Sequence, residues 1–404
     1  MMREYFKNTI AGIEAKLREE PARPNPRKKL ALGIARMGER LYAHENHIAW
    51  CGVTIPFELL TAMGVTSYFI EFMGAMLAST GMAGTLLANA EEQGFAADTC
   101  GYHRAVMGAA ISGALPRPAF LIGSTCPCAG GLATIENLAR HFNKKLLVLN
   151  VPRDDSQTSV ACLAGQLKEM VGFVAAHTGQ KPDTELLYTT IKNTNSARRL
   201  IADVYKLAAH VPSPASSRDL SNFGIVMALL FGTKDAIEIA QAFHDEFTNR
   251  IANNTSGVAG ERIRLLWIQN RIQFKNPVIT LLEDQYKAAI VTDELNDITW
   301  DEINPDDPYP GLARRAISIP FNGCIERRIT HLKKLANDYQ IHGAINPCHF
   351  GCRQGTGARG LIEKGLKAIG VPVLNLEVDC IDERNFAWGQ IKTRIEAFIE
   401  MVGG

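Results

Sequence analysis

Short apolar runs alternate with helical patterns in the first part of the chain. Runs of mostly apolar residues at 47–51, 118–125 and 145–151 predict buried strands. Between them, residues 56–64 and 133–142 space their apolar side chains at helical intervals. This alternation favours a parallel sheet that helices cover on both faces.

A second set of alternating elements occupies the last part of the chain. Apolar runs at 315–321, 342–347 and 371–379 predict strands, and the pattern of residues 388–402 predicts the final helix. Between about 166 and 290 the pattern is mostly helical. The sequence therefore predicts an α/β fold of two lobes, each built on a parallel sheet, with a helical insertion between them.

The N-terminal part of the chain predicts a helix followed by a linker. Phe6, Ile10 and Ile13 recur at helical intervals, as in a helix that docks by one face. The basic, proline-containing segment 20–29 predicts a linker. The expected division of the chain is an N-terminal helical segment and linker (1–45), a first α/β lobe (46–165), a helical region (166–290) and a second α/β lobe (291–404).

Length and composition limit the class of protein. A chain of 404 residues is too long for a single hydrophobic core, and 46% apolar with 21% charged residues is an ordinary globular composition. A formal net charge of +1 argues against a nucleic-acid partner or an anionic membrane surface. The most apolar stretch, residues 64–90, contains Glu71 and many small residues and predicts buried helix. We see no secretory signal, so the expected location is the cytoplasm.

Nine cysteines are unusual in a chain expected to be cytoplasmic. Disulfides are uncommon in that compartment, and an odd count fits a disulfide framework poorly. Because ligands collect beyond the carboxyl ends of parallel strands, thiols at such places favour metal or redox chemistry. Cys162 and Cys380 do not fit this placement, and we interpret them as small buried hydrophobes. The others are expected at strand ends or helix starts: Cys51, Cys100, Cys126, Cys128, Cys324, Cys348 and Cys352.

Three chemistries compete for these thiols. Structural zinc sites and thioredoxin-like motifs usually separate two cysteines by two residues, whereas the close pairs here have one and three intervening residues. An iron–sulfur cubane suits the set better, because thiolates from separate loops can meet around one cluster. His103, His349 and Arg353 lie beside cysteines and are candidates for offsetting the thiolate charge and for catalysis, unless they are ordinary surface groups.

Two further motifs have simple structural explanations. Residues 355–360, GTGARG, match the glycine pattern of dinucleotide-binding proteins, but they do not directly follow a predicted strand. We expect a loop packed against the thiols there. Residues 378–386 combine acidic and basic side chains, and an ion-pair turn explains them better than acid–base catalysis.

Several distinctive segments occur in order from about residue 45 to the C-terminus. They are WCGVTIPFELL, DTCGYHRAVMG, STCPCAGGLATIENLARHF with LLVLNVPRDD, HGAINPCHFGCR and VLNLEVDCIDERNFAWGQIKTRIEAFIEMV. In these segments the chain resembles the cluster-bearing component of the 2-hydroxyacyl-CoA dehydratase and benzoyl-CoA reductase family. The resemblance implies two Rossmann-like lobes and a [4Fe–4S] cubane on Cys100, Cys128 and Cys352. It also implies an ATP-hydrolysing iron–sulfur activator as the partner that delivers electrons.

Additional cysteines distinguish this chain from the usual pattern of that family. Cys51, Cys126 and Cys348 bring the thiols to six, and Cys324 competes with Cys51 for the sixth place. Six thiolates suffice for two cubanes, so the chain most resembles the double-cubane cluster protein branch. The cofactor that this implies is an [8Fe–9S] cluster, two [4Fe–4S] units joined by a bridging sulfide; a single [4Fe–4S] cluster is the alternative.

The resemblance also implies a function. Proteins of that branch resemble anaerobic, low-potential reductases that accept electrons from an ATP-dependent activator and reduce small unsaturated molecules such as acetylene, azide or hydrazine. A homodimer with a small-molecule substrate is expected, without a nucleic-acid or membrane partner. Two alternatives stay open: a subunit of a 2-hydroxyacyl-CoA dehydratase or benzoyl-CoA-type reductase with one cluster, and a non-catalytic iron–sulfur carrier.

Overall fold

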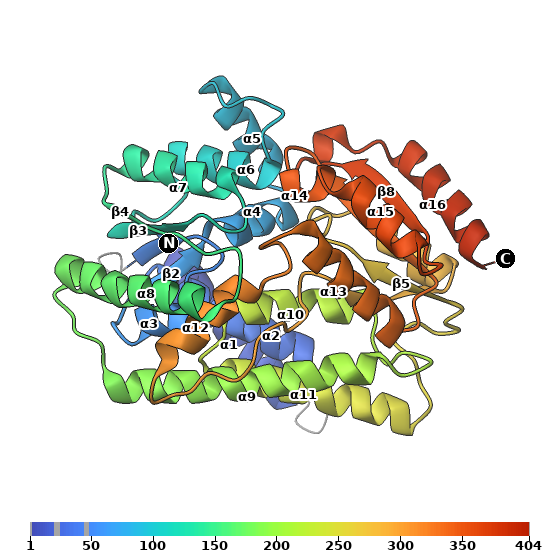
Figure 1. The fold of residues 1–404 in the computed structure, drawn as a ribbon, viewed down its shortest axis with the longest axis horizontal. Helices are drawn as coiled ribbons and strands as arrows, with labels where there is room; N and C mark the ends of the chain where they lie inside the picture. Colours follow the sequence, from blue (N-terminus) through green and yellow to red (C-terminus); the bar gives the residue numbers. More distant parts are fainter. Residues whose placement is uncertain (1, 20–24, 44–47, 404) are drawn as a thin grey trace.

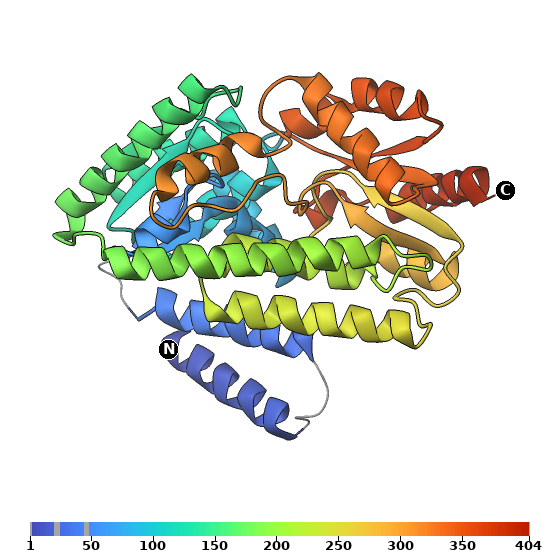
Figure 2. The same ribbon diagram turned by 60° about the horizontal axis from the view of Figure 1, so that its bottom comes forward.

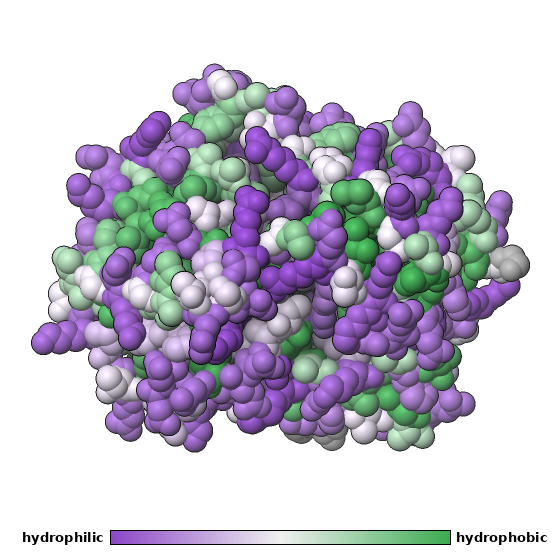
Figure 3. Space-filling view, in the orientation of Figure 1, coloured by the Kyte–Doolittle hydropathy of each residue, from purple (hydrophilic) through white to green (hydrophobic). Residues whose placement is uncertain are grey.

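The computed structural model describes residues 2–19, 25–43 and 48–403 of the chain. Two four-stranded parallel sheets form the centres of two lobes, and helices surround both (Figure 1). The predicted α/β fold with two lobes is confirmed. The face seen in Figure 3 is mostly hydrophilic, with scattered hydrophobic patches rather than one continuous patch.

The first lobe contains the sheet with strand order β2-β1-β3-β4. β1 and β3 are buried along their whole length, as expected of central strands with helices on both faces. The strands are β1 (Ile48–Cys51), β2 (Thr66–Phe69), β3 (Phe120–Ser124) and β4 (Leu146–Leu149). The helices are α3 (Phe57–Thr61), α4 (Ile70–Ser79), α5 (Ala83–Glu92), α6 (Gly101–Ile111), α7 (Ala129–Phe142) and α8 (Gln157–Thr178).

The second lobe contains the sheet with strand order β6-β5-β7-β8. β5, β6 and β7 are buried along their whole length. The strands are β5 (Ile263–Trp267), β6 (Ala288–Asp293), β7 (Gly343–His349) and β8 (Val373–Val378). The helical elements are η2 (Thr280–Gln285), α13 (Ile325–Asp338), α14 (Arg353–Thr356), α15 (Arg359–Lys367), η3 (Glu383–Asn385) and α16 (Trp388–Gly403).

Both sheets have a switch point, where the chain changes the direction in which it adds strands. β1 lies between β2 and β3, and β5 lies between β6 and β7. Open α/β sheets bind ligands beyond the carboxyl ends of the strands at such points. Cys51 ends β1, and Cys126 and Cys128 follow β3. Cys348 lies at the end of β7, and Cys352 follows it, so the thiols gather at the switch points of both sheets.

Long helices tie the two lobes together. α9 (Thr184–Ala208) and α11 (Lys234–Ala252) run side by side beneath both lobes, and α10 (Ser217–Leu229) packs nearby (Figure 2). α9 contacts α3 in the first lobe and β6 in the second. The N-terminal helices α1 (Met2–Glu19) and α2 (Pro26–Leu41) pair with each other, and α2 packs on α10 and α11.

α12 (Pro308–Ser318) brings the chain back to the first lobe, where it packs on α8. Leu312 and Ile317 of α12 share a buried cluster with Leu163 and Leu167 of α8. By length and composition α8 is also apolar enough to cross a membrane. The apolar face of α8 packs against α12 and the rest of this buried cluster, as the apolar face of a core helix does.

One strand prediction and one helix prediction for the second half of the chain need correction. Residues 315–321 are not a strand: 315–318 end α12, because its buried residues recur at helical spacing after a proline at the first turn. The region 166–290, predicted as mostly helical, also contains β5 and the start of β6. The apolar pattern does not reveal β5 because this strand carries Arg264, which is 3% exposed and pairs with Glu261 at 2.6 Å.

Two predictions near the N-terminus also need correction. Residues 64–90 are not helix throughout, because Thr66–Phe69 form the edge strand β2 before α4 and α5. Within the predicted linker 20–29, Pro26 already begins α2, where Asn25 caps the helix by accepting from the Lys28 N–H at 3.1 Å. Residues 20–24 of that linker lie outside the described residues.

Candidate functional site

Cys100, Cys128 and Cys352 each occupy the position before the first residue of a helix. They precede α6, α7 and α14 respectively. Cys128 Sγ accepts a hydrogen bond from the Gly131 backbone N–H at 3.3 Å. The free N–H groups at the starts of α6 and α7 favour negative charge, which offsets part of the cost of burying a thiolate there.

These three thiols converge from the two lobes. Burial raises the pKa of Cys128, and the charge of Cys100 raises it further. Burial, together with the charges of Cys100 and Cys128, raises the pKa of Cys352 to about 11. Such mutual repulsion requires proximity, and a positively charged centre between the sulfur atoms would relieve it.

Glycines allow the thiol-bearing turns to approach one another. Gly351 has a φ of +73°, and a Cβ there would clash with the backbone nitrogen of Cys100. A Cβ at Gly131 would lie 2.8 Å from Glu71 Oε1. At residue 351 only glycine can adopt this positive φ and also leave room for the Cys100 backbone. The turn after β7 can therefore lie against the start of α6.

Two histidines flank the Cys100 thiol. His349 Nε2 lies 3.2 Å from Cys100 Sγ, and Nδ1 of the same ring accepts from the Cys380 backbone N–H at 2.9 Å. Because Nδ1 accepts that bond, the neutral ring carries its proton on Nε2 and donates it to the sulfur. Burial opposes ionisation, but the neighbouring His103 and His349 lower the pKa of Cys100 to about 6. Cys100 is therefore a thiolate at neutral pH, the form that binds metals.

His103 lies between Cys100 and Glu71. Its Nε2 is 3.9 Å from Glu71 Oε1. Burial opposes protonation, but Cys100 and Glu71 together raise the pKa of His103 well above its ordinary value. Among the described residues, His103 Nδ1 and Glu71 Oε2 are buried without a hydrogen-bond partner, which leaves polar atoms beside the thiols. Glu71 is a site residue that the sequence does not reveal, because its apolar neighbours indicate only a buried helix.

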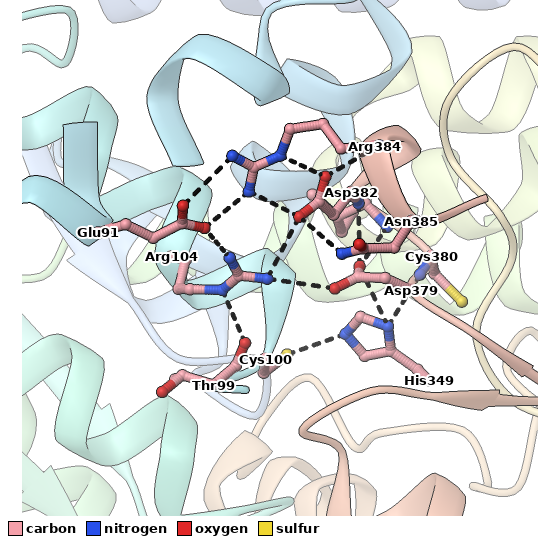
Figure 4. A network of polar contacts seen from close by, with 11 residues as sticks. Glu91, Thr99, Cys100, Arg104, His349, Asp379, Cys380, Asp382, Arg384 and Asn385 are labelled. Carbon is pink, nitrogen blue, oxygen red and sulfur yellow. Dashed lines mark hydrogen bonds and ion pairs between the residues drawn. The ribbon is translucent and has the colours of Figure 1, made fainter. Parts of the chain in front are cut away.

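Arg104 anchors the start of α6 to the second lobe (Figure 4). Its Nε donates to the Thr99 carbonyl at 2.8 Å. Its Nη2 lies 3.3 Å from Asp379 Oδ2 and 3.7 Å from Asp382 Oδ2. Because Thr99 precedes Cys100, this buried ion pair fixes one thiol of the first lobe to the loop after β8.

The loop after β8 is confirmed as an ion-pair turn, and its first part, residues 379–382, is buried. Arg384 pairs with Asp382 and with Glu91, each at 2.7 Å. Asp379 Oδ1 accepts from the backbone N–H groups of Ile381 and Asp382 at 2.8 and 3.0 Å. The carboxylates of this loop thus help to join the end of β8 to α5 and α6 (Figure 4).

A cavity of about 360 Å³ opens between the lobes next to the converging thiols. Cys126 and Cys324 line it, together with Arg153, Arg328 and Arg353. Cys126 is 5% exposed, whereas Cys324 and Arg353 are exposed. Cys324 precedes α13 and does not follow a strand, so the start of a helix places it at the rim of the cavity. Arg353, a predicted candidate for catalysis, therefore faces this cavity.

The glycine-rich segment 355–360 contributes to the same cavity. A loop was expected here, whereas the segment forms the junction of α14 and α15. Gly357 and Ala358 from this junction line the cavity.

Cys51 and Cys348 lie within strands and are fully buried. Cys51 Sγ is 3.6 Å from the Ala49 carbonyl, and Cys348 Sγ is 3.6 Å from the Asn346 carbonyl. Burial raises the pKa of both thiols. In this structure neither is among the residues that line the cavity.

The two cysteines interpreted as small hydrophobes differ from each other. Cys162 is exposed on α8, so the interpretation as a buried hydrophobe is wrong for this residue. Its neighbours in sequence form the buried face of the helix, and the side chain of Cys162 lies on the exposed face. Cys380 is fully buried, as expected. Burial raises the pKa of Cys380, and Asp379, Cys352 and Cys100 add to the effect, so it lies beside the site.

Throughout the part of the chain that the structure describes, no three His, Cys, Asp or Glu side chains are close enough to hold one ion. The charges of Cys100 and Cys128 nevertheless raise the pKa of Cys352, so the three thiols lie near one another. The role of all six predicted thiols in binding metal stays a prediction.

Comparisons with known proteins agree with this arrangement. The family model for "2-hydroxyglutaryl-CoA dehydratase, D-component" matches residues 52–402. The (R)-phenyllactyl-CoA dehydratase alpha subunit of Clostridium sporogenes is 24% identical, over 88% of this chain and 89% of its own length. The alpha subunit of lactoyl-CoA dehydratase from Anaerotignum propionicum is 23% identical over 88% and 90%. A benzoyl-CoA reductase subunit of Thauera aromatica is 24% identical over 79% and 80%. Since the family match contains Cys100, Cys128 and Cys352 and nearly all of both lobes, this chain belongs to the 2-hydroxyglutaryl-CoA dehydratase D-component family.

Proposed function

We propose that this chain is an iron–sulfur enzyme component in which Cys100, Cys128 and Cys352 hold a [4Fe–4S] cubane. The observation that carries the proposal is the convergence of these thiols at helix starts of both lobes, with Cys100 ionised at neutral pH. Thiolates are the ligands that such clusters require, and three of them leave one iron open to a further ligand. When bound, the cluster would supply one-electron transfer.

The surroundings of the thiols fit a negatively charged group. His349 donates from Nε2 to Cys100, and the N–H of Gly131 donates to Cys128. The raised pKa of His103 keeps a positive charge beside Cys100. Hydrogen bonds to the sulfur atoms and nearby positive charge stabilise thiolates and tune the potential of iron–sulfur centres.

The finer proposal is a low-potential reductase with an [8Fe–9S] double-cubane cluster. Its support is the presence of further thiols near the first three: Cys126 is two residues from Cys128, and Cys348 is four residues from Cys352. Electrons would come from a separate ATP-hydrolysing activator, since the sequence contains no phosphate-loop motif. The substrates would be small unsaturated molecules, and the protein would act as a cytoplasmic homodimer.

A second candidate function follows from the relatives. Their names describe subunits of acyl-CoA dehydratases and of a benzoyl-CoA reductase. This chain would then hold one cubane and act on an acyl-CoA thioester with a partner subunit. A non-catalytic iron–sulfur carrier is the third candidate, and it differs in how firmly it keeps its cluster.

Iron and sulfide analysis of anaerobically purified protein separates these candidates. A double cubane gives about eight irons per chain, and a single cubane about four. A carrier gives up its cluster to an apo-acceptor and shows no ATP-driven turnover with an activator. Cys128→Ser should lose iron, whereas Cys162→Ser, the matched change on the exposed face of α8, should keep it. Full iron content in Cys128→Ser contradicts the proposal.

A further inference from the structure

Gln354 joins the two lobes where the segments of Cys128 and Cys352 meet. Its backbone belongs to α14, two residues after Cys352, and its side chain reaches the first lobe. The side-chain Nε2 donates to the Pro127 carbonyl at 2.9 Å. This carbonyl belongs to the peptide bond between Pro127 and Cys128. One hydrogen bond therefore connects the segments that carry two of the three proposed cluster ligands.

The same nitrogen of Gln354 binds a third segment. It donates to the Phe321 carbonyl at 3.2 Å. Phe321 lies in the connection between α12, which packs on the first lobe, and α13 of the second lobe. The nitrogen of a side-chain amide carries two hydrogen atoms, so these two bonds use both of its donors. Gln354 thus fixes three segments relative to one another.

The backbone of Gln354 is held firmly in the second lobe. Arg328 Nη1 donates to the Gln354 carbonyl at 2.8 Å, and Gln269 Nε2 donates to the same oxygen. Arg328 is 2% exposed, and Glu294 binds it through hydrogen bonds of 2.6 and 2.8 Å. Because buried hydrogen bonds between charged groups are costly to break, the start of α14 has a rigid support. The side-chain amide of Gln354 is therefore directed at the first lobe by the second.

Gln354 differs in kind from the residues that tie Cys100 to the second lobe. Arg104 forms buried ion pairs with the loop after β8, and His349 donates directly to the Cys100 sulfur. Gln354 carries no charge, and both of its donors go to backbone carbonyls rather than to a sulfur atom. Its influence on the thiols is therefore geometric and acts through the backbone.

We propose that Gln354 is a positioning residue for the cubane. By fixing the peptide bond between Pro127 and Cys128 relative to α14, it keeps the sulfur atoms of Cys128 and Cys352 at the separation that one cluster requires. Partners beyond the ligands themselves orient those ligands, and their loss weakens metal binding and alters the electronic properties of the centre. This inference rests on the proposed function, because it assumes that these two thiols share a cluster.

The test uses two variants of Gln354 that nearly keep its shape. Gln354→Met removes both donors, and Gln354→Glu places an oxygen atom opposite the two carbonyl oxygens. Gln166→Met is the matched control, because Gln166 Nε2 also donates to a backbone carbonyl, that of Asn150 at 3.0 Å, in an exposed contact within the first lobe. On anaerobic protein we would measure the iron content, the rate at which a chelator removes the iron, and the electron paramagnetic resonance spectrum after reduction. Circular dichroism and urea unfolding of the iron-free proteins report on the fold.

We expect both Gln354 variants to release iron about tenfold faster than the unaltered protein and to show an altered resonance spectrum. Gln166→Met should match the unaltered protein in both. An unchanged release rate and spectrum in a folded Gln354 variant overturns the inference, and either variant decides if the other does not fold. A lower urea midpoint without a change in release or spectrum overturns it too, because Gln354 would then only support the fold.

Failure of this inference differs from failure of the proposed function. Unchanged Gln354 variants leave the cubane in place as long as Cys128→Ser loses iron. Unaltered protein that contains no iron after anaerobic purification refutes the proposed function, and the role of Gln354 with it.

Discussion

Replacement of Arg104 by methionine tests whether the buried ion pairs hold the two lobes together at the site. Arg104 and Asp379 are each 1% exposed, and Asp382 is 0% exposed. Methionine retains much of the packing of the side-chain stem but leaves the carboxylates without this cation. Removal of one partner of a buried ion pair costs about 3–5 kcal/mol. Because Arg384 still pairs with Asp382, we expect the free energy of unfolding to fall by an amount near the lower end of this range, about 3 kcal/mol.

The loss should depend on pH in a defined direction. Burial opposes ionisation of Asp382, but hydrogen bonds from Arg384 and the charge of Arg104 lower its pKa. A carboxyl with a lowered pKa in the folded state contributes stability above its unfolded pKa of about 4, and this contribution disappears as pH falls through the folded pKa. The difference between the unaltered protein and Arg104→Met should thus be full at pH 7 and shrink below about pH 4.

The assay is urea unfolding of the iron-free proteins under anaerobic conditions, followed by circular dichroism at pH 7 and at lower pH. Arg199→Met is the matched control, because Arg199 and Glu302 form an exposed pair at 3.1 Å, with side chains 57% and 46% exposed. Such pairs contribute little, and the free energy of unfolding should change by no more than about 1 kcal/mol. Equal, small shifts of the unfolding midpoint in both variants would refute the reasoning.

Two further substitutions probe the site and its support. Gly351→Ala should lower the iron content, because the new Cβ would meet the Cys100 backbone; Gly81→Ala, at a similar φ of +76° but with no atom within 4 Å, should keep its iron and lose only about 1 kcal/mol. Equal iron content in these two variants contradicts the role given to Gly351. Glu294→Gln should lower the free energy of unfolding by about 3–5 kcal/mol, because it leaves the buried Arg328 without its counter-ion. An unchanged urea midpoint would show that this pair does not stabilise the fold.

The arrangement of the thiols could be predicted where local pattern determines it. Cys128 follows an apolar strand and precedes a well-patterned helix, so its place at a sheet edge follows from sequence alone. The same holds for Cys352 after β7. The apolar residues 315–321 predict a strand end for Cys324, whereas they belong mainly to the last turn of α12 and the loop before α13.

The features that sequence could not reveal depend on contacts between distant segments. Arg264 lies in the buried strand β5, and its charge obscures the strand unless it is known that the distant carbonyl of Tyr339 accepts from its Nε at 2.8 Å. Glu71 carries no motif, and its place beside the site appears only when α4 and α7 come together. Most of the features that the sequence does not predict therefore depend on charged or hydrogen-bonding partners that lie far apart in the chain.

The most direct test of the central claim is diffraction from anaerobically grown crystals with anomalous data at the iron absorption edge. We predict anomalous density enclosed by the sulfur atoms of Cys100, Cys128 and Cys352, between the two lobes. Iron bound elsewhere in the chain, with these three thiols free, would contradict the account.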